Sequence, residues 1–116
     1  MLWLRVNERP DSTYMHPLIE RNREAITRLC LLHGVSRLEA FGSIVREDFD
    51  EVKSDVDILV EFDPAVAASF QNFLDLKESL EALFHRPVDL IELHAVRNRR
   101  LRHYIEQSRS RIYDAA

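Results

Sequence analysis

Residues 41–46 read Phe-Gly-Ser-Ile-Val-Arg and residues 54–62 read Ser-Asp-Val-Asp-Ile-Leu-Val-Glu-Phe, and these two stretches decide the fold. The second stretch alternates apolar and other side chains with the period of two that is typical of a β-strand. Its apolar set is Val56, Ile58, Val60 and Phe62. Asp55 and Asp57 share the opposite face, with Cα atoms about 7 Å apart. The pattern therefore predicts a strand over residues 55–62 that packs on helices and presents two carboxylates from its other face.

Paired carboxylates on one face of a strand repel each other. A fold tolerates them when a cation lies between them or when water surrounds both. Asp55 and Asp57 are thus a candidate pair of divalent-metal ligands, and a solvated turn at the start of the strand is the competing interpretation.

The Gly-Ser pair follows a short predicted strand, residues 37–41, and precedes residues that can begin a helix with Ser43 near its N-cap. Gly42 has no side chain, so an anion could approach the backbone N–H groups, and the Ser43 hydroxyl could add a hydrogen bond. Arg46, about one turn further on, could reach the same anion. The sequence therefore predicts either a phosphate-binding turn or an ordinary capped helix.

Together, Gly42-Ser43 and the Asp-x-Asp-x-Leu-Val-Glu-Phe run that begins at Asp55 closely resemble the DNA polymerase β-like nucleotidyltransferase superfamily. More narrowly, they resemble the minimal nucleotidyltransferases (MNT) of prokaryotes, over roughly residues 17–115. The resemblance implies that Gly42, Ser43 and Arg46 bind the triphosphate of ATP. It implies that Asp55 and Asp57 hold Mg²⁺, with two ions expected.

One spacing departs from the family pattern. Eleven residues, Ile44 to Ser54, separate Ser43 from Asp55, where the family usually has ten, and Glu47 stands where many members have glycine. The extra residue is expected to lengthen the loop at residues 48–53, which puts nucleotide affinity in doubt but not the metal pair.

Composition bounds the class of protein. The chain has 116 residues, 46% of them hydrophobic, which suffices for one compact domain with a modest core. Its net charge of −4 argues against a surface that binds nucleic acid throughout. Cys30 is the only cysteine and falls on an apolar helical stripe, so a buried, inert thiol is expected. These features, and the lack of any run of about 20 apolar residues, predict a soluble cytoplasmic protein.

Hydrophobic spacing predicts three helices and one further strand around the central stretches. The helices are expected at residues 17–33, with Gly34 as the cap residue, at residues 69–84, and at residues 98–112. Residues 88–93 read as a third strand. Residues 1–14 are expected to form a poorly ordered arm, and residues 15–116 a single domain.

The third predicted strand carries Asp89 near its beginning, where a buried carboxylate would need a partner. In the family that this chain resembles, the Val-Asp-Leu position supplies a third metal-site carboxylate, so the resemblance gives Asp89 that role and that of a possible base. A solvated strand end is the alternative. Glu92 is a weaker candidate, because its spacing places it on the other face of the strand.

These elements predict an α/β fold, a small mixed sheet with helices mainly on one face and the carboxylate face open. The resemblance implies an MNT antitoxin, an enzyme that transfers AMP from ATP to a tyrosine of a HEPN-domain toxin with which it forms a hetero-oligomer. The alternatives are an antitoxin that acts by binding alone with an idle nucleotide site, and a nucleotidyltransferase for a small molecule. The last predicted helix has a basic face that could dock a protein or RNA, or could simply be solvated. Its members are Arg97, Arg99, Arg100, Arg102, His103, Arg109 and Arg111.

Overall fold

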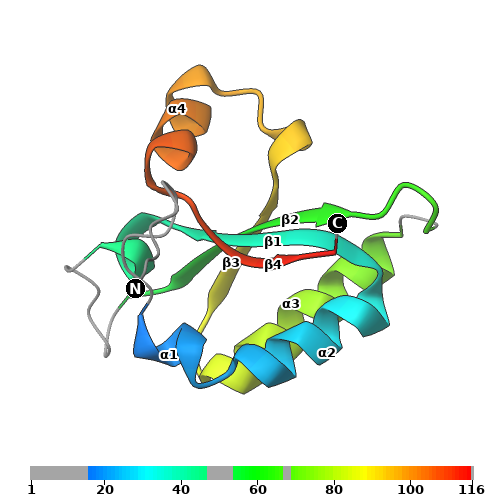
Figure 1. Cartoon of the computed structure of the whole chain (residues 1–116). Helices are drawn as coiled ribbons and strands as arrows, with labels where there is room; N and C mark the ends of the chain where they lie inside the picture. Colours follow the sequence, from blue (N-terminus) through cyan, green and yellow to red (C-terminus); the bar gives the residue numbers. More distant parts are fainter. Residues whose placement is uncertain (1–15, 47–53, 67–68, 116) are drawn as a thin grey trace, which may run out of the picture.

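The computed structural model describes residues 16–46, 54–66 and 69–115 (Figure 1). The predicted arm at residues 1–14 and the predicted long loop at residues 48–53 lie outside them. No helix in the described ranges is long and apolar enough to span a bilayer. The elements are α1 (Pro17–Glu20), α2 (Arg23–His33), β1 (Val35–Phe41), η2 (Gly42–Val45), β2 (Val56–Phe62), α3 (Phe70–Phe84), β3 (Val88–Glu92), η3 (Leu93–Ala95), α4 (Arg99–Ser108) and β4 (Ser110–Asp114).

The strands form a mixed sheet in the order β3-β2-β1-β4. β1 is antiparallel to both of its neighbours, whereas β2 and β3 run parallel. The parallel pair is connected through α3, as a crossover requires. The prediction of a small mixed sheet is confirmed, with one strand more than expected.

The main core lies between one face of the sheet and helices α1, α2 and α3, which all lie below the sheet in Figure 1. The even-numbered residues of β2 that the alternation pointed to this side are buried there: Val56, Ile58 and Val60. Helix α4 lies on the opposite side of the sheet. The prediction of helices mainly on one face is therefore confirmed, with α4 as the exception.

The predicted helix over residues 17–33 is broken at Arg21 and Asn22. The Asn22 side-chain amide donates to the carbonyl oxygen of Leu18 at 2.7 Å, a local bond that competes with continuation of the helix. Gly34 caps α2 in the left-handed conformation, as predicted. Leu32 is 76% exposed, because α2 turns another face to the core.

The last predicted helix also ends early. Arg109 is extended, and residues 110–114 form β4 on the open edge of β1. Ile112 is buried in the core from this strand rather than from a helix. A helical reading of this segment missed that its buried Ser110 and Ile112 alternate as in a strand, and that β1 offers unpaired backbone groups.

Helix α3 fixes the start of β3. Ser69 caps the helix by accepting from the N–H of Asn72, and His85 ends it in the left-handed conformation. The Glu81 carboxylate accepts the N–H of Val88 at 3.0 Å and so holds the first residue of β3 against the helix. Phe70, in the first turn of the helix, is 75% exposed.

Candidate active site

The parallel register of β2 and β3 brings two of the predicted acids side by side. Asp57 of β2 is paired with Asp89 of β3, and Val56 with Val88. Both valines are buried in the core, so the alternation turns both aspartates to the other face of the sheet. Asp55 lies just before β2, is exposed, and acts electrostatically on Asp57. Three acids from two distant segments of the sequence thus gather at one corner of the sheet.

Charge and burial act together on Asp57, which is half-buried whereas Asp55 and Asp89 are exposed. Burial, followed by the negative charges of Asp89 and Asp55, raises the pKa of Asp57 to about 6. Arg46 acts in the opposite direction. These four charged groups therefore share one electrostatic environment, although Arg46 comes from the turn after β1.

Gly42 brings that turn against the acids. Its φ is +75°, and a Cβ placed on it would overlap the Oδ2 atom of Asp57. The missing side chain is therefore required both by the backbone conformation and by the approach of the Asp57 carboxylate. Ile44 is fully buried and anchors the turn in the core.

The conformation after Gly42 differs from the prediction. Ser43 lies inside the 3₁₀ turn η2, whose N-cap is Phe41, and Arg46 is extended and ends the turn. A four-residue turn develops little of the dipole of an α-helix, so a helix dipole contributes little to anion binding here. What remains for an anion is the set of N–H groups at a side-chain-free corner, the Ser43 hydroxyl and the Arg46 guanidinium.

Helix α4 adds two residues that the sequence did not single out. Ser108 accepts the N–H of Gly42 at 3.2 Å, and Nη1 of Arg46 donates to the Tyr104 hydroxyl at 2.9 Å. The guanidinium of Arg46 also lies 5.6 Å from the centre of the Tyr104 ring. Ile105 anchors the helix in a small second apolar cluster with Phe41 and Leu59. The i, i+4 spacing of Tyr104 and Ser108 was the available signal, but only the fold shows what the pair faces.

The donor set fits a divalent cation in its chemistry. Three carboxylates supply the hard oxygen ligands that Mg²⁺ prefers, and their mutual repulsion is what a cation would relieve. In the described ranges, however, no three His, Cys, Asp or Glu side chains already stand in the geometry of a metal-binding cluster. Glu92 lines a cavity beside α3 with Phe73, away from Asp89, as its spacing predicted.

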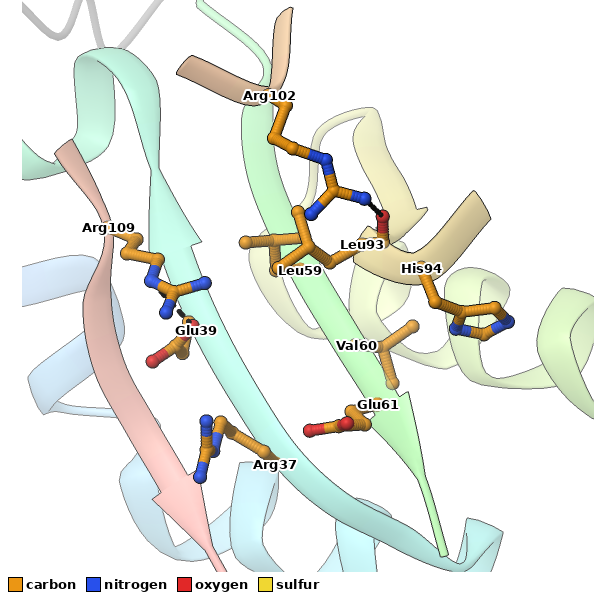
Figure 2. Close-up of a pocket in the computed structure, with 9 residues that line it drawn as sticks. All are labelled: Arg37, Glu39, Leu59, Val60, Glu61, Leu93, His94, Arg102 and Arg109. Atoms are coloured by element: carbon orange, nitrogen blue, oxygen red, sulfur yellow. Dashed lines mark hydrogen bonds and ion pairs between the residues drawn. The ribbon is translucent and has the colours of Figure 1, made fainter. Parts of the chain in front are cut away.

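A separate cavity of about 380 Å³ lies on the same face of the sheet (Figure 2). Residues of the predicted basic face line this cavity from two different segments. Arg102 belongs to α4 and donates to the Leu93 carbonyl oxygen at 2.9 Å, whereas Arg109 lies beyond the helix, 3.6 Å from the buried carboxylate of Glu39. The expectation of one continuous basic helix face is therefore wrong. None of the six predicted site residues lines this cavity. Its lining residues are Arg37, Glu39, Leu59, Val60, Glu61, Leu93, His94, Arg102 and Arg109.

A side-chain-free turn lies against clustered carboxylates on an open mixed sheet, which is the arrangement that the resemblance to nucleotidyltransferases predicts. The family model described as polymerase beta, nucleotidyltransferase matches residues 24–116. The chain therefore belongs to the polymerase β nucleotidyltransferase family of enzymes, and within it to the minimal nucleotidyltransferases that include named protein adenylyltransferases.

Two named proteins are similar to this chain in sequence. A Methanocaldococcus jannaschii protein named as a candidate protein adenylyltransferase is 38% identical over 75 residues, covering 65% of this chain and 74% of its own. The protein adenylyltransferase MntA of Thermococcus cleftensis is 47% identical over 58 residues, covering 50% and 56%.

Solved structures share the fold. That of a candidate minimal nucleotidyltransferase is 30% identical, with a TM-score of 0.66, covering 84% of this chain and 97% of its own. A Shewanella oneidensis structure, a tri-AMPylated HEPN toxin in complex with its MNT antitoxin, is 18% identical, with a TM-score of 0.59 and coverage of 83% and 72%. At that identity the likeness concerns the fold alone.

Proposed function

We propose that this protein is a Mg²⁺-dependent protein adenylyltransferase that transfers AMP from ATP to a tyrosine of a HEPN-type toxin partner and thereby acts as an antitoxin. The observation that carries the proposal is the juxtaposition of Asp57 and Asp89, in register on neighbouring parallel strands, with the Gly42 turn. The names of the relatives support protein adenylylation, and the neighbouring complexes support the kind of partner.

Each group has a task in that reaction. The N–H groups of the Gly42-Ser43 turn, the Ser43 hydroxyl and the Arg46 guanidinium would hold the triphosphate, because all are donors at a corner that lacks a side chain. Asp55 and Asp57 would hold Mg²⁺, with Asp89 completing the ligand set. Bound Mg²⁺ supplies neutralisation of the phosphate charge. Asp89 is exposed at the open face, where it could take the proton of an incoming hydroxyl.

The test uses ATP labelled in the adenine, Mg²⁺ and the product of the neighbouring gene. Wild-type protein should label the partner on tyrosine, and Asp55→Ala with Asp57→Ala should reduce transfer at least 10³-fold, the order expected when metal-held charge stabilisation is lost. Asp75→Asn, an exposed acid on α3 away from the site, is the matched control and should leave transfer unchanged. Equal labelling by wild type and the double variant would reject the catalytic proposal.

A second function is favoured by one observation. Ser108 already accepts the Gly42 N–H, and Tyr104 already accepts from Arg46, so α4 engages groups that a triphosphate would use. An antitoxin that only binds its toxin would not need them free. In that case the Asp55 and Asp57 double variant would still neutralise the toxin in cells, whereas charge reversal of the exposed Arg99 and Arg100 would weaken the complex.

A further inference from the structure

Tyr104 places a phenol beside the Gly42 turn of the candidate active site. Its hydroxyl lies 2.9 Å from Nη1 of Arg46 and 3.4 Å from the position that a Cβ would take on Gly42. The same Cβ position would overlap the Oδ2 atom of Asp57. The Tyr104 hydroxyl and the Asp57 carboxylate therefore border one small space, the space that Gly42 leaves open.

The tyrosine is held there by packing, and its ring remains accessible. Its ring makes an edge-to-face contact with Phe41, with ring centres 6.4 Å apart, and the neighbouring Ile105 is fully buried. Tyr104 is nevertheless 41% exposed. The helix that carries it meets the sheet through one small cluster rather than through the main core. A hydroxyl so placed can stay at the site while a ligand enters from solvent.

Arg46 links the phenol to the group proposed to clamp the triphosphate. Its Nη1 atom donates to the Tyr104 hydroxyl at 2.9 Å, and a guanidinium is a planar fork of N–H donors that suits a phosphate. A phosphate held by this guanidinium would lie beside the phenol oxygen. The side chain proposed to clamp the triphosphate would thus also hold an acceptor hydroxyl next to it.

We propose that Tyr104 is an adenylylation site of this chain, modified in cis by its own active site. This inference rests on the proposed function, since it uses the same nucleotide and the same class of acceptor. The phenol oxygen attacks the α-phosphorus of ATP and forms a P–O bond. The bond from the α-phosphorus to the oxygen that bridges it to the β-phosphorus breaks, pyrophosphate leaves, and the phenol proton passes to a carboxylate of the aspartate corner. The product is an AMP ester of Tyr104 and pyrophosphate.

The modification would limit itself. An AMP group on Tyr104 remains at the corner formed by Gly42 and Arg46, where a second ATP would have to bind. The expected stoichiometry is therefore about one AMP per chain, and the modified chain should transfer AMP to a partner more slowly than the unmodified one.

Peptide mapping tests the inference on the wild-type protein. Cleavage after arginine isolates residues 103–109, His-Tyr-Ile-Glu-Gln-Ser-Arg, in which Tyr104 is the only tyrosine. After incubation of the full chain with ATP and Mg²⁺, this peptide should gain the mass of one adenylyl group, and fragmentation should place it on Tyr104 rather than on Ser108. The first-order rate constant should not change on tenfold dilution, because the acceptor is in the same molecule.

Two variants sharpen the result. Tyr104→Phe should abolish the label, whereas Tyr113→Phe, which removes a half-buried tyrosine of β4, should leave both its rate and its stoichiometry unchanged. Label on another peptide, label only at high protein concentration, or no label would each overturn the inference. None of these outcomes decides the proposed function, which is read separately from transfer to the partner.

Discussion

Replacement of Asp57 by asparagine should stabilise the metal-free protein while it removes activity. Burial and the charges of Asp89 and Asp55 raise the pKa of the Asp57 carboxyl from an ordinary 3.8 to about 6. Between these two values the folded chain binds a proton that the unfolded chain does not. Stability from this group is therefore fully present below pH 3.8 and is lost as pH rises through about 6. The asparagine keeps the shape of the side chain and does not ionise.

The size of the gain follows from that difference. One pH unit between the two pKa values corresponds to about 1.4 kcal/mol, so the ceiling is about 3 kcal/mol. Asp57 is only half-buried, and solvent screens its charge, so we expect about 1–2 kcal/mol near pH 8. In a domain of this size that raises Tm by about 3–8 °C.

The assay is thermal unfolding in EDTA at several pH values between about 5 and 8. The gain of Asp57→Asn over wild type should be largest at the highest pH and should shrink as pH falls below about 6. Asp75→Asn, on the exposed side of α3, is the control for loss of a surface charge and should show no such trend. An unchanged Tm at pH 8, or a gain that is equal at every pH, would refute the electrostatic reasoning.

Three further predictions concern single positions. Gly42→Ala should lower the free energy of unfolding by about 1–3 kcal/mol and abolish AMP transfer, because it combines a positive φ with overlap of the Asp57 carboxylate. Gly34→Ala, at the positive-φ cap of α2, is the control. It should lower the free energy of unfolding by a comparable amount, measured by chemical denaturation, yet keep the activity per folded molecule. The Cys30 thiol is fully buried, and burial raises its pKa to about 12. A thiol reagent at pH 8 should therefore label Cys30 only at the rate of unfolding. Rapid labelling in native buffer would contradict the predicted packing. Glu81→Gln should loosen the start of β3. Hydrogen bonds from the first backbone N–H of that strand and from Lys77 hold the pKa of Glu81 below its usual range, so the stability that this carboxylate contributes to the wild type is lost on acidification. Hydrogen exchange at residue 88 should accelerate in Glu81→Gln but not in Asp75→Asn.

Where local pattern and tertiary environment agree, the sequence was sufficient. The alternation around Asp57 predicted β2 to within one residue, because a strand buried on one face must place apolar residues at every second position. The cap at Gly34 was likewise readable, since it depends on one residue and its immediate backbone. The predictions that failed depended on distant segments. Whether residues 110–114 continue a helix or add a strand is decided by the open edge of β1, which no local window contains.

The candidate site shows the same difference between what the sequence predicts and what the tertiary structure decides. The sequence by itself predicted the chemistry of the site: the residue types and their spacing on one strand and one turn pointed to Gly42, Ser43, Arg46, Asp55 and Asp57, and the family resemblance added Asp89 on another strand. Only the tertiary structure decided that Asp57 and Asp89 are adjacent, since that adjacency comes from parallel pairing of strands whose connection runs through α3. It alone also placed Tyr104 and Ser108 at the Gly42 turn, because the contact joins residues about sixty positions apart and depends on which side of the sheet α4 takes.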